Sequence, residues 1–319
     1  MRARALALLL TLSRGLAQWR LCHFGDPQIG FGNEGLASVD AERFRAAAGA
    51  ASSRCGAVAI AGDLLNVYGN ATQLAAFKTV WPGAFGAPPR LVPGNHDVES
   101  MSELSAFRST FGADYGVDEY TLGDVRLRVV AVDSEAILNL GNDSALAAES
   151  EAQWAWLNAT LTTTPPASTL TTPPASNNTT ETILLLHHPP FITSEDEADQ
   201  YYNWPSGPRA RFLALVRGAG VRHLLCGHTH TTTTVSAADA AFTVYTVGGT
   251  ARIFDDNGFG YSELTWNASA RDFDVAYQRL DVTSTVEECV DVFHGHPYPC
   301  RPDVPRVEPA GYFTLKGRG

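Results

Sequence analysis

The 319-residue sequence predicts an α/β fold. Its first half alternates short apolar runs with longer stretches of helical periodicity, and each apolar run stops at Gly or Pro. Such alternation implies a parallel sheet, whose ligand-bearing loops lie beyond the carboxyl ends of the strands. We therefore expect strands at 21–24, 57–61 and 90–92, with helices near 37–51 and 70–80.

The second half of the chain has a different pattern. A hairpin is expected across Gly123-Asp124, and the segment "TTPPASTL" at 163–170 is nearly repeated at 171–178. A Thr/Pro tract cannot bury a core, so 161–180 is expected to be a surface insertion. The remaining expected elements are hairpin strands 119–122 and 125–133, helices 149–160 and 207–219, strands 182–186 and 221–226, and further strands to about 281. We therefore expect one domain at 18–285 that contains this insertion. A Pro-rich tail at 286–319 is expected to pack on the outside of the domain.

Composition and charge exclude several classes of protein. Hydrophobic residues make up 45% and charged residues 18%, which is typical of a soluble globular protein. The formal net charge is −11 with no Lys/Arg cluster, which argues against nucleic-acid or anionic-membrane binding. A phosphorylated substrate must then be attracted by a local positive centre such as bound metal. We expect a monomer without a membrane-spanning helix.

The N-terminus indicates secretion. Arg2 and Arg4 precede an apolar run that is too short to span a membrane, and Gly15-Leu16-Ala17 offers small residues for cleavage. Residues 1–17 are therefore expected to be a signal peptide; the alternative is an N-terminal helix of a cytoplasmic protein. Six glycosylation triplets agree with secretion, at Asn70, Asn142, Asn158, Asn177, Asn178 and Asn267.

The five cysteines are an odd number. Cys289 and Cys300 bracket a Pro-rich part of the tail and form the expected disulfide. Cys22, Cys55 and Cys226 lie at or beside apolar runs, where a buried free thiol is the default expectation.

Five short segments share one design, in which a strand ends in a sharp turn and a side chain that can bind metal. They are Gly25-Asp26-Pro27-Gln28, Gly62-Asp63-Leu64-Leu65-Asn66, Gly94-Asn95-His96-Asp97, His187-His188-Pro189-Pro190 and Gly227-His228-Thr229-His230. Imidazole, carboxylate and amide donors together suit Zn, Fe or Mn better than calcium. Taken singly, Asp-Pro and Gly-Asn are common turn pairs, and a lone histidine is more often structural. Five such turns at successive strand ends favour a metal site.

The order of these motifs resembles the calcineurin-like metallophosphoesterases, whose pattern runs D-x-H, GD, GNH(D/E), H, GHxH. The chain reproduces it from about residue 19 to 281, with Gln28 in place of the first histidine. This resemblance implies a four-layer sandwich of two mixed sheets flanked by helices. The Asp-Pro-Gln motif and the segment Tyr201-Tyr202-Asn203 are closer still to the calcineurin-like phosphoesterase domain-containing protein 1 group. That group implies Ser/Thr protein phosphatase activity.

The same resemblance implies a role for each motif residue. Two divalent ions (Mn, Fe, Zn or Mg) are expected, one held by Asp26 and His230 with Gln28 nearby. Asp63 would bridge both ions. The second ion would be held by Asn95, His187 and His228. Gln28 either ligates weakly through its amide oxygen or only satisfies the turn backbone.

The implied mechanism is attack on phosphorus by a hydroxide that bridges the two metals. His96 would face the leaving oxygen as general acid, or else only brace the turn, and Asn95 would stabilise the developing charge. Asp97 is expected to shape the loop. Ser/Thr phosphatases of the superfamily carry a second Asp and an Arg where this chain has Asn66 and Val67, so it is not a close relative of those enzymes.

Substrate preference is less defined by the sequence. Tyr201, Tyr202, Trp204 and His188 are candidates for the mouth of the site, although aromatic residues at this spacing are more often packing. An acidic run at 195–199 is either a solvated loop or a rim that disfavours polyanions. The expected function is hydrolysis of phosphomonoesters. The alternatives are a phosphodiesterase acting on cyclic nucleotides or phospholipid head groups, and a non-catalytic secreted binding protein.

Overall fold

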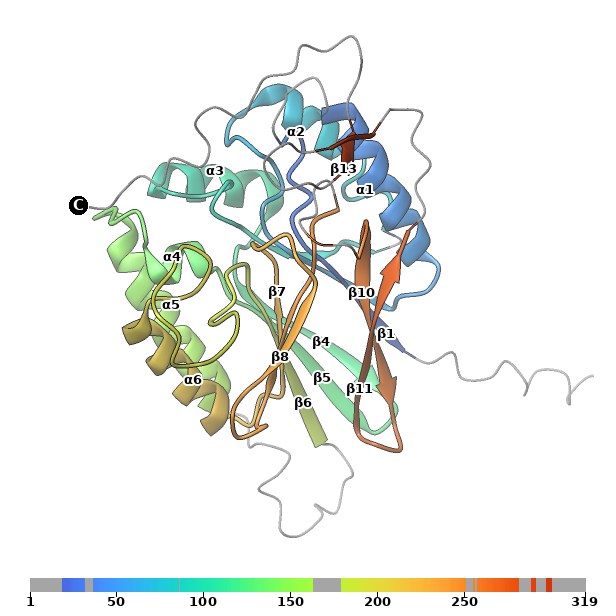
Figure 1. Cartoon of the computed structure of the whole chain (residues 1–319). Helices are drawn as coiled ribbons and strands as arrows, with labels where there is room; N and C mark the ends of the chain where they lie inside the picture. Colours follow the sequence, from blue (N-terminus) through green and yellow to red (C-terminus); the bar gives the residue numbers. More distant parts are fainter. Residues whose placement is uncertain are drawn as a thin grey trace, which may run out of the picture.

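The computed structural model describes residues 19–31, 37–85, 87–162, 179–250, 255, 257–280, 288–290 and 297–299. Two mixed β-sheets pack face to face, and helices cover the outer face of each (Figure 1). This is the four-layer sandwich that the motifs imply. The predicted signal peptide, the repeats at 163–178 and most of the tail lie outside the described residues, so those predictions stay predictions.

The first sheet has the strand order β11-β10-β1-β2-β3. Its three central strands run parallel, and β10 and β11 add an antiparallel edge beside β1. The bounds are β1 Arg20–Phe24, β2 Ala57–Ala61, β3 Arg90–Val92, β10 Gly260–Asn267 and β11 Asp272–Arg279. Because β1, β2 and β3 are parallel, their carboxyl ends and the loops that follow lie at one edge.

The second sheet has the order β4-β5-β6-β7-β9-β8. Strands β5, β6, β7 and β9 are parallel, and the hairpin partners β4 and β8 are antiparallel to them. The bounds are β4 Gly116–Leu122, β5 Val125–Ala131, β6 Thr179–Leu185, β7 His223–Cys226, β8 Thr233–Ser236 and β9 Thr243–Thr246. A separate pair is formed by β12 Glu288–Val290 and β13 Pro297–Pro299.

Helices lie on both outer faces of the sandwich, and Figure 1 shows α4, α5 and α6 together on one flank and α1, α2 and α3 on another. Asn70, Ser100 and Asp133 cap three of them by accepting backbone N–H groups of the first turn. The bounds are α1 Ala37–Ser52, α2 Ala71–Lys78, α3 Met101–Phe111, α4 Ser134–Leu138, α5 Leu146–Thr162 and α6 Ser206–Gly218. Within the described residues, no helix is long and apolar enough to cross a membrane.

Three apolar clusters match the three interfaces between layers. One joins the first sheet to α1 and α2 through residues such as Phe24 and Phe44, and another joins the second sheet to α5 and α6. The third fills the space between the sheets, where Ala59 of β2 and Val129 of β5 are buried. The core therefore holds the carboxyl edges of both sheets together.

Most elements expected from the sequence are present, including the hairpin across Gly123-Asp124. Helices α3 and α4 were not predicted. The expectation of free thiols is wrong for Cys22 and Cys55, which form a disulfide with a Cα–Cα distance of 5.8 Å. Cys226 is free and buried, as expected. The predicted Cys289–Cys300 pair lies outside the described side chains.

Candidate metal centre

All five motifs follow the carboxyl ends of strands, three in the first sheet and two in the second. Gly227 N donates to the carbonyl of His187, and His187 Nδ1 lies 2.6 Å from the carbonyl oxygen of Ala61 at the end of β2. The two sheet edges therefore meet at the site. Several candidate ligands have left-handed backbone, which L-residues rarely adopt and which concentrates at functional sites: Asp26 (φ 43°), Gln28 (31°), Asp63 (50°), His228 (72°) and His230 (54°).

Two buried carboxylates form one side of the centre. Both oxygens of Asp26 accept the backbone N–H of His228, at 2.9 and 3.0 Å, and Asp63 Oδ1 accepts the N–H of His96 at 2.9 Å. The His187 ring lies between them, with Nδ1 3.9 Å from Asp26 Oδ1 and Nε2 3.4 Å from Asp63 Oδ1. His230 Nε2 is 4.0 Å from Asp26 Oδ1. One oxygen or nitrogen from each of Asp26, Asp63 and His187 lies within 4.8 Å of the others.

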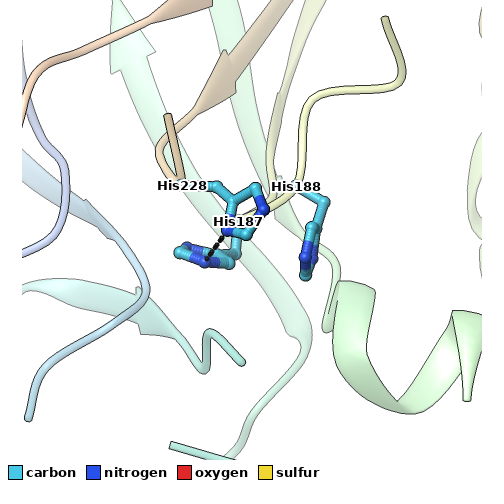
Figure 2. A group of neighbouring side chains, drawn as sticks. All are labelled: His187, His188 and His228. Carbon is cyan, nitrogen blue, oxygen red and sulfur yellow. Dashed lines mark hydrogen bonds between the residues drawn. The ribbon is translucent and has the colours of Figure 1, made fainter. Parts of the chain in front are cut away.

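The imidazole side shows why a cation fits. A carbonyl can only accept, so His187 donates through Nδ1 to Ala61 and keeps a lone pair on Nε2. His228 Nε2 faces the carbonyl of Tyr201 at 3.2 Å, which leaves a lone pair on its Nδ1. These two lone-pair nitrogens are 3.1 Å apart (Figure 2). Asn95 Oδ1, another acceptor, is 3.2 Å from His187 Nε2.

The pKa shifts keep these imidazoles neutral. Burial lowers the pKa of His187 to about 4, against the opposing charge of Asp63. Burial, and then repulsion by His188 and His187, lowers the pKa of His228. Neutral imidazole is the form that ligates metal. With no proton between these acceptors, a divalent cation satisfies them all, so the donor set fits the implied metals.

The carboxylates differ from each other. Burial, and then the charge of Asp63, raises the pKa of Asp26. Burial would also raise the pKa of Asp63, but His187 and His96 outweigh it and the pKa is lowered. Asp63 is therefore the anion around which the other groups are arranged, in keeping with its predicted bridging position.

Gln28 is buried, with 1% of its surface exposed, and its Oε1 has no hydrogen-bond partner among the described residues. Its backbone N–H donates to the carbonyl of Asp63 at 2.7 Å, which fastens the first motif to the second. A buried acceptor without a partner costs about 1–3 kcal/mol, a penalty that a cation would remove. This orphaned oxygen is a second observation that fits metal.

Glycine is required at Gly94 because the backbone passes so close to the ligands. A Cβ at Gly94 would lie 2.2 Å from Asp63 Oδ1 and 2.7 Å from His187 Cε1. The third motif can therefore approach both halves of the site only without a side chain here.

The third motif also carries His96 and Asp97. His96 is half-buried, and its Nδ1 lies 2.7 Å from the carbonyl oxygen of Asn66, so its Nε2 is left for other partners. The backbone of Asn66, not its side chain, thus holds this histidine. The Asp97 carboxylate accepts N–H groups of Leu64, Leu65 and Gly94, which confirms the predicted loop-shaping role.

The structure separates the residues expected at the mouth. Tyr201 and Tyr202 are exposed, but His188 has 1% of its surface exposed and its Nδ1 is 2.7 Å from Glu135 Oε1. For Trp204 the packing alternative holds, because it is fully buried and donates to the carbonyl of His188. His188 also has a ring nitrogen within 4.8 Å of those of His187 and His228 (Figure 2).

Glu135 and Ser134 are contacts that the sequence analysis missed. Ser134 Oγ accepts the N–H of His188 at 3.1 Å, and both residues lie on α4 directly after β5. The signal was present, since an apolar strand followed by Asp133-Ser134-Glu135 repeats the design of the five motifs.

The acidic run does not form a rim of free carboxylates around the metal candidates. Glu195 pairs with Arg217 at 2.6 Å, and Glu197 accepts N–H groups of the turn at 192–194. With Arg209, these residues line a cavity of about 580 Å³ to which no candidate metal ligand contributes.

Comparison with known proteins agrees with this geometry. Residues 20–232 match the calcineurin-like phosphoesterase family. The chain matches no curated protein sequence. Among solved structures, GAP50, the anchor in the inner membrane complex of Plasmodium, is 13% identical with a TM-score of 0.57, and the match covers 91% of this chain and 92% of that one.

Two further solved structures are similar at lower scores. Purple acid phosphatase PPD1 from yellow lupin (Lupinus luteus) seeds is 15% identical over 88% of this chain and 52% of its own, with a TM-score of 0.49. The protein TT1561 of Thermus thermophilus is 13% identical over 82% and 99%, with a TM-score of 0.43. The family match spans well over half of the sequence, so the chain belongs to the calcineurin-like phosphoesterase family.

Proposed function

We propose that the protein is a dinuclear metal-dependent phosphomonoesterase of the secretory pathway. One observation carries the proposal: two neutral imidazole lone pairs, an amide oxygen and the Asp63 carboxylate converge without a proton among them. Asp26, Gln28 and His230 would hold one ion, and Asn95, His187 and His228 the other, with Asp63 between them.

The chain's own residues divide the work. Bound cations supply Lewis-acid polarisation of phosphate oxygens and lower the pKa of water. His96, fixed through Nδ1 by the carbonyl of Asn66, directs Nε2 toward the leaving oxygen. As an imidazolium, protonated at both ring nitrogens, it would deliver the Nε2 proton there. Asn95 donates through Nδ2 to Tyr201 and so positions a hydroxyl beside the phosphate. His188, anchored by Glu135, packs against the His228 ring at 4.0 Å between centroids and keeps it in place.

We propose phosphomonoesters, and not diesters, as the substrate class. The resemblance to the calcineurin-like phosphoesterase domain-containing protein 1 group favours phosphoserine and phosphothreonine in proteins. A second candidate is a non-catalytic binding or anchoring role. It is favoured by the fold shared with GAP50 and by the loss of one imidazole at Gln28.

Metal content and turnover decide between these functions. Wild type, Gln28→His and the control Gln278→His on β11 are assayed with p-nitrophenyl phosphate and its bis-ester. We expect close to two ions per chain and faster hydrolysis of the monoester in wild type and control. Fewer than one ion and no turnover in wild type, with both regained only in Gln28→His, would favour the binding role.

Secretion is supported by the Cys22–Cys55 disulfide, because disulfides persist in oxidising compartments. The native protein is expected to lose mass on enzymatic deglycosylation and to begin near Gln18. An unchanged mass with an intact Met1 would place the protein in the cytoplasm instead.

A further inference from the structure

The large apolar side chains that are exposed in the described residues lie in two turns that adjoin the candidate metal centre. In the described part of the chain, four large apolar side chains are exposed: Val67 (41%), Tyr68 (39%), Tyr201 (56%) and Tyr202 (38%). We call these four residues, three of which are tyrosines, the aromatic rim. Single exposed apolar residues need no explanation, but a group confined to one site marks a binding surface.

Contacts connect both parts of the aromatic rim to consecutive residues of the third motif. The carbonyl of Asn66, directly before Val67, lies 2.7 Å from His96 Nδ1. Tyr201 Oη accepts from Asn95 Nδ2 at 3.1 Å, and the Tyr201 carbonyl faces His228. Asn95 and His96 are consecutive, so their Cα atoms are about 3.8 Å apart. The turns that carry the two pairs of side chains therefore both adjoin the candidate metal centre.

Each pair is presented by a tight turn. Asn70 N donates to the carbonyl of Val67, which puts Tyr68 inside a turn that leads into α2. Gln200 N donates to the side chain of Asn203, and this Asn also donates to the carbonyl of Ala198. Tyr201 and Tyr202 are the central residues of that second turn. Because both turns are already ordered, little conformational entropy is lost when they bind a ligand.

The rings and the hydroxyl suit different parts of one ligand. The Tyr201 and Tyr202 rings stand edge to face, with centroids 5.1 Å apart, a geometry that leaves apolar surface for a further ring. The Tyr201 hydroxyl oxygen accepts from Asn95 Nδ2, so its own hydrogen can be donated to a phosphate oxygen. A neutral apolar alcohol also suits a chain of net charge −11.

We propose that the aromatic rim is a specificity subsite that selects phosphomonoesters whose alcohol carries a flat apolar ring. The ring would lie between Tyr68 on one side and the Tyr201–Tyr202 pair on the other while the phosphate occupies the metal centre. The inference rests on the proposed function and adds the class of alcohol that the enzyme prefers.

The test compares 3-phenylpropyl phosphate with propyl phosphate, whose leaving alcohols are almost equally basic, so that chemistry does not bias the comparison. Wild type is expected to show a kcat/KM ratio of about 10 or more in favour of the phenyl ester, from ring burial. Tyr68→Ala and Tyr202→Ala should bring the ratio toward one, whereas Tyr68→Phe and Tyr202→Phe should retain it. Metal content and Tm verify that each variant is folded.

Equal kcat/KM for the two esters in wild type, or a ratio that survives both alanine substitutions, would overturn the subsite. If neither ester is hydrolysed, the proposed function fails, and binding of 3-phenylpropylphosphonate and propylphosphonate is measured by calorimetry. Preferential binding of the phenyl compound, lost in the alanine variants, would still support the subsite. Equal binding would overturn it independently of catalysis.

Discussion

The two halves of the candidate metal centre are built in different ways. The first sheet supplies Asp26, Gln28, Asp63 and Asn95, all oxygen donors, on loops joined by backbone hydrogen bonds such as Gln28 N to Asp63 O. The second sheet supplies His230 together with His187 and His228, whose tautomers are set by the carbonyls of Ala61 in the first sheet and of Tyr201. The loops of the oxygen half are therefore joined to one another as well as to the second sheet, through the His228 N–H at Asp26, whereas the His187 ring is held by a carbonyl of the first sheet.

The largest effect is expected from Asp63→Asn, which removes the carboxylate that we propose both halves share. The loss in kcat should exceed the ~10²–10³-fold typical of one electrostatic group, because metal binding is lost as well. Metal analysis and turnover of p-nitrophenyl phosphate measure it. The matched control is Asp124→Asn, whose carboxylate forms only an exposed pair with Arg271. Activity retained in Asp63→Asn would show that this carboxylate is not a shared ligand.

The second prediction concerns the support of the oxygen half. The Cys22–Cys55 disulfide ties β1 to the segment that enters β2, and the two cysteines are 33 positions apart in sequence. Closing a loop of this length stabilises by about 3–4 kcal/mol in the chain-entropy account. The free energy of unfolding, measured with a denaturant, should be lower by this amount in the double variant Cys22→Ala/Cys55→Ala. A reducing agent should lower the Tm of wild type but not that of the variant. Equal Tm values with and without reductant would contradict a disulfide that stabilises the fold.

This bond also shows a limit of prediction from sequence. The apolar run at 21–24 predicted the strand, but the partner of Cys22 follows from the parallel register in which Cys22 faces Val58, three residues beyond Cys55. Register depends on both sheets packing together, so local composition favoured a free thiol. Helix α4 was not predicted because its five residues are too few to show helical periodicity. The contact between Glu135, which lies on this helix, and His188 was therefore not predicted either.

The placement of the metal candidates was predicted better, because each motif follows the end of a strand. The end of a strand and the type of the next polar residue are local features, so residues such as Asp26 and His228 could be named from sequence alone. Whether a neighbour turns toward the ion is not local. His187 and His188 are adjacent and both buried, yet one faces the carboxylates and the other Glu135.

The third prediction tests the point where the halves touch. Gly94→Ala would place a methyl group against both Asp63 and His187. Metal affinity should fall by about 10–100-fold, the range seen when the groups supporting a metal ligand are disturbed. The control is Gly49→Ala on α1, where a methyl meets nothing within 4 Å and helix propensity gives a gain of about 1 kcal/mol. Unchanged affinity in Gly94→Ala would mean that the third motif moves freely.

The smallest effect is expected at the seam between the sheets, where His23 of β1 is fully buried beside the carbonyl of Cys226 of β7. Burial lowers the pKa of His23 to about 3 from 6.5. Between these values the unfolded chain binds the proton and the folded chain does not, so stability is lost as pH falls below 6.5. The linkage amounts to about 1.4 kcal/mol per pH unit, or about 2 kcal/mol at pH 5. His23→Met fills a similar volume with an apolar side chain and removes the titrating ring. Its free energy of unfolding relative to that of wild type should therefore rise by about 2 kcal/mol between pH 7.5 and pH 5. If the difference in free energy of unfolding between His23→Met and wild type is the same at both pH values, then His23 accepts a proton within the fold. Burial of this ring would then not explain a loss of stability in acid.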